Sequence, residues 1–233
     1  MDIKNSVAVV TGANRGFGRH LAEGLLARGA AKVYAGARNP ASVDLPGVQP
    51  LRLDITDPES VAAAAAVAGD ATLLVNNAGI STGTGLLDGD LAEIRREMET
   101  HYFGTLDMTR AFAPVLAANG GGGVLNVLSV LSWIHLPHLG AYSAAKAAAW
   151  AMSNALRLEL APLGISVTAL HVGYMDTDMT VNVDAPKLDP ATVAADALDG
   201  IEAGLGEVLA DDLSRQVKAG LAADLKVLYP QLP

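Results

Sequence analysis

The chain has no cysteine, few charged side chains and no long hydrophobic run. The absence of cysteine excludes disulfide bonds and thiolate metal sites, and makes a reducing, cytoplasmic setting the default expectation. No apolar run reaches the ~18 residues that a membrane-spanning helix needs. Residues 1–5 lead directly into a strand-like run, without the layout of a signal peptide. We therefore expect a cytoplasmic protein with no membrane partner.

Positive charge is also scarce, since 16 Lys and Arg face 25 Asp and Glu and leave a net charge of -9. Binding to a phosphate backbone needs a basic face, so nucleic acid is not an expected partner. The 233 residues, 51% of them hydrophobic, suffice for one domain with a substantial core. No linker or repeat divides the chain, and we expect a single domain over residues 1–233.

Short β-branched runs alternate with longer stretches rich in alanine and leucine. The expected strands cover residues 7–10, 32–35, 49–53, 72–75, 124–128, 165–170 and 207–210. The expected helices cover residues 16–28, a segment that starts at Asp57-Pro58, residues 91–118, 141–161 and 190–203, and a final segment after residue 212. This alternation predicts an α/β fold: a doubly wound, parallel, seven-stranded sheet with helices on both faces, Rossmann-like. Ligands of such sheets bind at the carboxyl ends of the strands.

A glycine-rich turn, Thr11-Gly-Ala-Asn-Arg-Gly-Phe-Gly18, follows the first expected strand and opens the first helix. Glycines adopt positive φ and let a ligand approach the backbone, and a helix start offers free N–H groups to a pyrophosphate. The spacing is G-x-x-x-G-x-G rather than the commoner G-x-G-x-x-G. A simple glycine turn is the alternative, so the motif needs support from elsewhere.

The end of the second strand gives that support. An NAD site carries an acidic residue there for the ribose 2′-hydroxyl, but this chain has Ala37 at that position, followed by Arg38. A guanidinium suits a 2′-phosphate, and Arg15 projects from the glycine turn toward the same place. Either arginine alone is better explained as a solvated surface residue. Together they favour NADP(H) over NAD(H).

Three side chains near the fifth strand form a second constellation. Tyr142 and Lys146 are four residues apart and so share one helix face, and Ser129 ends the strand upstream of them. A Tyr-x-x-x-Lys pair alone occurs by chance in many helices. A serine at a strand end, however, lies where the ligands of such a sheet bind.

The ordered set of motifs resembles the short-chain dehydrogenase/reductase family in its single-domain form. The matching pieces are residues 11–18, Asp54, Asn76-Asn-Ala-Gly79, Ser129, Tyr142-Ser-Ala-Ala-Lys146, Gly173 and Thr177, which span roughly three quarters of the chain. The resemblance implies that Tyr142 is the general acid, that Lys146 favours its phenolate and binds the ribose, and that Ser129 holds the substrate oxygen. The expected cofactor residues are Gly12, Asn14, Arg15, Gly16, Phe17, Gly18, Arg38, Asp54, Ile55, Asn76, Ala78, Gly79, Tyr142, Lys146, Gly173 and Thr177.

The chain departs from the family pattern at two positions. The family has a catalytic asparagine in an Asn-x-x-Gly-Thr stretch, where this chain has His101. His101 either takes part in a proton relay with its own pH dependence or simply packs in the helix, and the sequence does not separate these readings. The usual Pro-Gly after the sixth strand is Val172-Gly173.

The expected substrate is a small ketone or aldehyde, or the matching alcohol, with an apolar body. Leu131, Trp133 and Tyr174 fall near Ser129 and Gly173 and are candidates for the pocket wall, with core packing as the alternative. His135 and His138 have no evident third ligand, so we expect no metal site.

The family resemblance also implies a homodimer or homotetramer. A catalytically silent NADP(H) sensor is the main rival function. A hydrolase with Ser129 as its nucleophile lacks the G-x-S-x-G turn.

Overall fold

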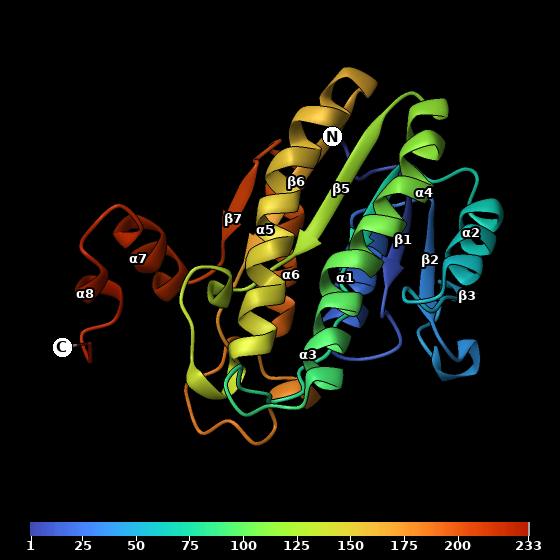
Figure 1. Cartoon of the computed structure of the whole chain (residues 1–233). Coiled ribbons are helices and arrows are strands. Elements are labelled where there is room, and N and C mark those ends of the chain that lie inside the picture. Colours follow the sequence, from blue (N-terminus) through green and yellow to red (C-terminus); the bar gives the residue numbers. More distant parts are fainter. Residues whose placement is uncertain (233) are drawn as a thin grey trace.

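The computed structural model describes residues 1–232, and its centre is a parallel sheet of seven strands (Figure 1). The strand order is β3-β2-β1-β4-β5-β6-β7. The strands are β1 (Val7–Thr11), β2 (Lys32–Ala37), β3 (Gln49–Arg52), β4 (Leu73–Asn76), β5 (Gly122–Val127), β6 (Ile165–His171) and β7 (Glu207–Leu209). The order reverses between β1 and β4, so a crevice for a ligand is expected above their carboxyl ends. The predicted doubly wound sheet is confirmed.

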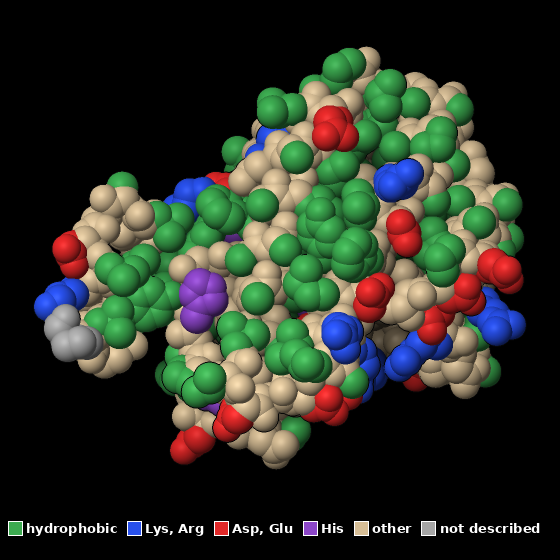
Figure 2. All heavy atoms as spheres, viewed as in Figure 1, with side chains coloured by type: hydrophobic (Ala, Val, Ile, Leu, Met, Phe, Trp, Pro, Cys, Tyr) green, Lys and Arg blue, Asp and Glu red, His purple; other side chains and the backbone are tan. Residues whose placement is uncertain are grey.

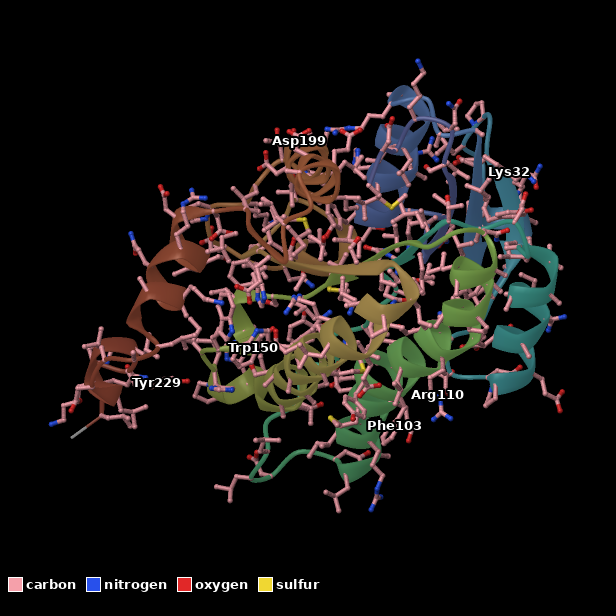
Figure 3. All side chains as sticks on the ribbon, turned by 90° about the horizontal axis from the view of Figure 1, so that it is seen from above. Lys32, Phe103, Arg110, Trp150, Asp199 and Tyr229 are labelled. Atoms are coloured by element: carbon pink, nitrogen blue, oxygen red, sulfur yellow. The ribbon has the colours of Figure 1, made fainter. Side chains whose placement is uncertain are left out.

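Helices cover both faces of this sheet, as the alternating pattern predicts. They are α1 (Gly16–Ala27), α2 (Pro58–Val67), α3 (Leu91–Met98), α4 (Thr105–Ala118), α5 (Gly140–Leu160), α6 (Pro190–Glu202), α7 (Asp212–Gly220) and α8 (Leu225–Leu228). Figure 3 shows α1 and α6 on one side of the sheet and α4 and α5 on the other, so that Asp199 and Phe103 lie on opposite surfaces. The short helices α7 and α8 stand to the side, beyond β7 (Figure 1). No helix within residues 1–232 is both long and apolar enough to span a bilayer.

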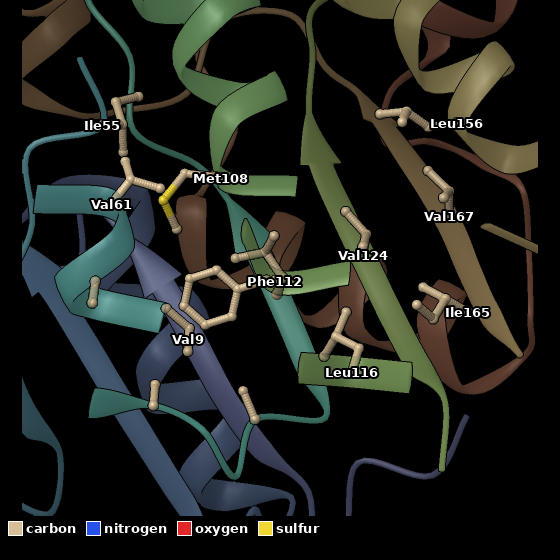
Figure 4. Close-up of a cluster of buried hydrophobic side chains, with 14 of the residues drawn as sticks. Val9, Ile55, Val61, Met108, Phe112, Leu116, Val124, Leu156, Ile165 and Val167 are labelled. Carbon is tan, nitrogen blue, oxygen red and sulfur yellow. The ribbon is translucent and has the colours of Figure 1, made fainter. Parts of the chain in front are cut away.

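Alternate side chains of the strands feed two cores, one on each face of the sheet. On β1, Val9 joins the core under α2, α4 and α5, whereas Val10 joins the core under α1 and α6. Phe112 of α4 is fully buried in the first of these cores (Figure 4). Removing a buried phenylalanine ring costs roughly 3–5 kcal/mol. The sheet is therefore a firm platform for residues that follow its strands.

The predicted helix at residues 91–118 is interrupted. Between α3 and α4 the chain forms a π-helical turn, Glu99–Gly104 (η2). Insertions of this kind are frequent at functional sites. Here the turn carries His101, and Gly104 lies so close to Ile55 that an added Cβ would sit 2.9 Å from the Ile55 carbonyl oxygen. The turn therefore brings the helix and the segment after β3 into direct contact.

Candidate active site

A cavity of about 1220 Å³ lies at the carboxyl ends of the strands. Its wall comes from the segments that follow β1, β2, β3, β4, β5 and β6, together with residues of η2 and α5. Segments far apart in the sequence meet there because parallel strands end at one edge of the sheet. The cavity is thus in the place that the sequence pattern predicts for a ligand.

The glycine-rich turn after β1 forms one end of the cavity. Gly12 and Gly16 have φ of +65° and +53°, values that L side chains rarely adopt. A Cβ at Gly18 would overlap the carbonyl oxygen of Gly12, so the turn and the start of α1 can pack this closely only with glycine there. Arg15, at the N-cap of α1, makes no side-chain cap, which leaves the first N–H groups of the helix free for an anion. Asn14 and Phe17 also line this end.

The loop after β4 holds the glycine turn from the other side. Asn77 donates its side-chain amide to the carbonyl oxygen of Thr11 at 2.9 Å, and its backbone N–H donates to the Thr11 hydroxyl at 2.9 Å. Ala78 and Gly79 line the cavity as expected. The sequence interpretation did not single out Asn77, although its position as the first residue after the strand is a usable signal.

Asn76 requires a correction. It is the last residue of β4, is 6% exposed and does not line the cavity. Its side chain donates to Asn126 at 2.9 Å and to Thr109 at 3.2 Å. The side chain therefore points into the protein and ties β4 to β5 and α4, so it is not available to line a ribose.

Residues with the charge suited to a phosphate lie near the end of β2. Arg38 is exposed and lines the cavity. Arg15 lines it too, and its guanidinium forms an ion pair with Asp178 at 2.9 Å, with both side chains about 70% exposed. Exposed pairs of this kind contribute little stability, so Arg15 can exchange Asp178 for another anion. Asp54 and Ile55 line the same region.

Ser129, Tyr142 and Lys146 come together in the wall of this cavity. Ser129 lies in the segment that follows β5. Tyr142 and Lys146 lie one turn apart at the start of α5. The Lys146 Nζ donates to the carbonyl oxygen of Val127 at 2.8 Å and lies 5.6 Å from the centre of the Tyr142 ring. The predicted convergence of a hydroxyl, a phenol and an ammonium is therefore present.

Burial shapes the acidity of this group. It raises the pKa of the Tyr142 phenol above its ordinary value, the nearby Glu97 carboxylate adds to that rise, and the Ser129 hydroxyl opposes it through a hydrogen bond. Burial also lowers the pKa of Lys146 to about 8, against the attraction of Glu97. Both effects favour neutral forms because a buried charge loses its hydration.

His101 is 2% exposed and lies in the cavity wall beside Tyr142. Its ring meets the phenol ring edge-on, with centroids 5.1 Å apart. The ring Nε2 is 2.8 Å from the carbonyl oxygen of Ile80 and 3.1 Å from Oε2 of Glu97. Burial lowers the pKa of His101, and the Lys146 charge lowers it further, while Glu97 opposes both. The His101 side chain is therefore fixed in the wall of the site, in contact with the loop after β4.

The sequence interpretation did not include Glu97, although its spacing of four residues from His101 is a signal for contact on one helix face.

The sequence interpretation did not include Asp211 either. Its carboxylate accepts the N–H groups of Gly173 and Ser214, both at 2.6 Å, and so fixes the segment after β6. Gly173 and Thr177 line the cavity as expected.

Thr177 precedes the short helical turn Asp178–Thr180. The Thr180 hydroxyl accepts the backbone N–H of Thr177 at 3.5 Å. No group of three or more metal-ligating side chains occurs within residues 1–232. His135 instead makes a 2.6 Å hydrogen bond with Tyr229.

The expected substrate wall is partly correct. Leu131 and Tyr174 line the cavity, with the apolar side chains of Ile134, Leu136, Leu139, Val172, Met175, Met179 and Leu213 nearby. Trp133 does not line it, which corrects the sequence interpretation. Its ring is 5% exposed, stacks on His171 with centroids 3.8 Å apart, and meets Trp150 edge-on at 6.0 Å. Trp133 therefore belongs to a neighbouring hydrophobic cluster.

Comparison with known proteins gives consistent matches. The family model described as short chain dehydrogenase matches residues 6–188. The bovine (Bos taurus) protein named dehydrogenase/reductase SDR family member 7B is 32% identical over 99% of this chain and 79% of its own length. An NADPH-dependent 1-acyldihydroxyacetone phosphate reductase of Schizosaccharomyces pombe is 35% identical, over 56% of this chain and 46% of that protein.

Among solved structures, a short chain dehydrogenase from Burkholderia cenocepacia J2315, crystallised in complex with NADP, superposes with a TM-score of 0.95. It is 44% identical, and the match covers 100% of this chain and 99% of that one. The similarity therefore extends over the sheet, the helices and the cavity together.

Proposed function

This chain belongs to the short-chain dehydrogenase/reductase family, and we propose that it is an NADP(H)-dependent reductase of ketones or aldehydes, reversible as an alcohol dehydrogenase. One observation carries the proposal: Ser129, Tyr142 and Lys146 line the same cavity as the glycine turn that follows β1. A dinucleotide held by that turn would extend toward the three side chains. We further propose that residues 1–233 form one NADP(H)-binding domain.

Each side chain has a distinct task in the proposed reaction. The nicotinamide ring, when bound, supplies the hydride to the carbonyl carbon. Tyr142 gives its proton to the carbonyl oxygen, and Ser129 donates a hydrogen bond to that oxygen as negative charge develops. The Lys146 ammonium stabilises the phenolate that remains, and a shift of one pKa unit in this sense is worth about 1.4 kcal/mol. Lys146 would also bind the hydroxyls of the nicotinamide ribose.

Arg38 and Arg15 support NADP(H) as the cofactor. Arg38 stands exposed in the cavity wall after β2, where an NAD site has an acidic residue, and a guanidinium can bind a 2′-phosphate through two parallel hydrogen bonds. The Burkholderia cenocepacia structure in complex with NADP and the NADPH-dependent fission-yeast reductase support the same preference.

Other residues of the cavity wall would bind the rest of the cofactor. Asp54 and Ile55 would bind the adenine, Ala78 and Gly79 its ribose, and Gly173 and Thr177 the carboxamide.

An apolar substrate body fits the wall around Tyr142. Leu131, Tyr174 and the neighbouring leucines, isoleucine and methionines offer few polar partners to a substrate. We propose a small-molecule ketone or aldehyde whose carbonyl is its main polar group.

A substrate panel tests this function. NADPH oxidation is followed by absorbance with apolar ketones and aldehydes of graded size, and alcohol formation is quantified in parallel. We expect equal amounts of NADPH consumed and alcohol formed for at least one apolar carbonyl compound. Tight NADPH binding without turnover of any compound would favour a sensor on the same fold, the rival that the change to His101 suggests.

We also propose that the protein is a cytoplasmic homodimer or homotetramer that associates through α4 and α5. Figure 2 shows hydrophobic atoms gathered over the face that these two helices form. Phe103 and Leu158 are 45% and 77% exposed there. Light scattering coupled to gel filtration measures the subunit number.

A further inference from the structure

Glu97 is a carboxylate in an unusual place. It lies on α3, the helix that precedes η2, and it is 0% exposed. One of its oxygens accepts the backbone N–H of Thr82 at 2.6 Å, and the other has His101 Nε2 as a neighbour at 3.1 Å. A buried carboxylate with so few partners loses much of its hydration energy. A glutamate at the surface would hold the Thr82 loop without losing this hydration energy. The burial of Glu97 therefore needs another explanation.

The surroundings of Glu97 supply one. Burial raises the pKa of Glu97, but the neighbouring His101 ring and the Thr82 amide outweigh it and bring the pKa below its ordinary value, which favours the carboxylate. His101 stays neutral because burial and the Lys146 charge lower its pKa. The interior beside the cavity thus holds one carboxylate and one ammonium, and the neutral His101 ring lies edge-on against the Tyr142 phenol.

Titratable groups from several elements surround Tyr142. Tyr142 is faced by Glu97 from α3, by His101 from η2 and by Lys146 from its own helix. Ser129 after β5 and Tyr174 after β6 also act on it, the first through a hydrogen bond. Next to Glu97, Arg96 is paired with Glu93 at 2.9 Å at the surface. Among these groups Glu97 is the buried carboxylate, and its negative charge opposes the fall in the pKa of Lys146.

We propose, on the basis of the reductase function above, that Glu97 is the buried counter-charge of the Tyr142–Lys146 pair and that His101 holds it in place. It is a positioning residue that keeps a proton on that pair, which suits carbonyl reduction. In that direction the carbon–oxygen double bond gains a hydride at carbon, the oxygen takes the phenol proton, and solvent later returns a proton to the pair. The pair must therefore be fully protonated at the start of each turnover.

The negative charge of Glu97 determines the direction in which this residue shifts the pKa values of Tyr142 and Lys146. A neighbouring negative charge makes a proton harder to remove from a phenol or an ammonium, and Glu97 acts in this sense on both Tyr142 and Lys146. Since the two groups interact, the first proton lost belongs to the pair. Replacing Glu97 by an uncharged residue should make that loss occur at lower pH.

The test compares Glu97→Gln with Glu99→Gln, which removes an exposed charge two residues away. The rate of reduction at saturating NADPH and substrate is measured against pH. Glu97→Gln should move the alkaline fall in rate about one pH unit lower, and Glu99→Gln should leave it in place. Glutamine retains a carbonyl oxygen for the Thr82 amide, so a role limited to holding the loop would leave the profile unchanged and overturn the proposal.

A second variant covers the case in which Glu97→Gln does not fold. His101→Phe keeps an aromatic ring against Tyr142 but removes the nitrogen that holds the carboxylate. Without that nitrogen the Glu97 carboxylate is no longer held beside Tyr142, and the alkaline fall should move to lower pH, as in Glu97→Gln. The double variant should move it no further than Glu97→Gln alone, whereas additive shifts would contradict a shared action.

A readout that needs no substrate separates this inference from the proposed function. Lysines labelled with ¹³C at Cε are titrated by NMR, and the Lys146 signal is assigned with Lys146→Met. Lys146 should titrate at lower pH in Glu97→Gln than in the parent protein, even if no carbonyl compound is turned over. An unchanged Lys146 titration would refute the counter-charge whatever the enzyme reduces.

Discussion

The Nζ of Lys146 lies 5.6 Å from the centre of the Tyr142 ring, while it donates a 2.8 Å hydrogen bond to a strand-end carbonyl. The two residues are one turn apart on α5, and that helix is tied to β5 by a 2.9 Å hydrogen bond between Asn126 and Ser153. Because β5 and the inner face of α5 are both buried, the fold itself sets this spacing. The proposed catalytic pair is thus held in position by the protein core.

We predict that the cofactor preference depends on Arg38. Arg38→Asp should weaken NADPH binding roughly 10- to 100-fold, since a charge-assisted hydrogen bond contributes about 1.5–3 kcal/mol. NADH binding should improve, because the new carboxylate can accept hydrogen bonds from the ribose hydroxyls. The kcat/KM values for the two cofactors measure the change.

Arg52→Asp is the matched control for that experiment. Arg52 is exposed at the end of β3 and does not line the cavity. The same change of charge there should leave the cofactor ratio unaltered. Equal effects at both positions would indicate general electrostatics, and Arg38 would lose its assigned role.

The glycine turn makes a prediction about backbone contact. Gly18→Ala places a Cβ against the carbonyl oxygen of Gly12 and the side chain of Asn77, so the turn must open. NADPH affinity should fall at least about tenfold, the equivalent of about 1.4 kcal/mol. Fluorescence titration measures it, with Gly69→Ala as the control because a Cβ there meets nothing closer than 3.7 Å. Undiminished affinity in Gly18→Ala would mean that the turn is not the cofactor cradle.

Acid should destabilise the protein through His171. This residue is 0% exposed, and burial, as the largest effect, lowers its pKa from 6.5 to about 4. The unfolded chain binds a proton as the pH falls through 6.5, whereas the folded protein does so only near 4. Stability is therefore lost across that window, by on the order of 3 kcal/mol in the free energy of unfolding.

Urea unfolding across that pH range, with and without His171→Gln, measures this contribution. The variant should show a smaller loss of stability on acidification, whatever its stability at neutral pH. The exposed His138→Gln should keep the full dependence. A parent protein and a His171 variant with parallel curves would contradict the assignment.

Local signals were enough for much of the fold. The alternation of strands and helices predicts the sheet, and Asp57 caps α2 by accepting the Glu59 N–H at 3.0 Å, as its position before Pro58 indicates. The order of motifs likewise identifies Ser129, Tyr142 and Lys146.

Features set by packing between elements were not predictable in this way. Asn76 and Trp133 belong to stretches of chain that reach the cavity, but strand register and cluster packing turn their side chains away from it. The π-helical turn and the burial of Glu97 depend on how α3 meets the loop after β4. The sequence shows that Glu97 and His101 are four residues apart, but it does not show that both side chains are buried.

The most direct test of the account is the rate of NADPH-dependent carbonyl reduction by Tyr142→Phe, measured beside NADPH affinity. Removal of the proposed general acid should lower the rate by about 10²- to 10⁴-fold and leave NADPH affinity within about twofold of the parent protein, a difference of roughly 0.4 kcal/mol. A variant that reduces the carbonyl compound as fast as the parent protein would show that Tyr142 does not supply the proton.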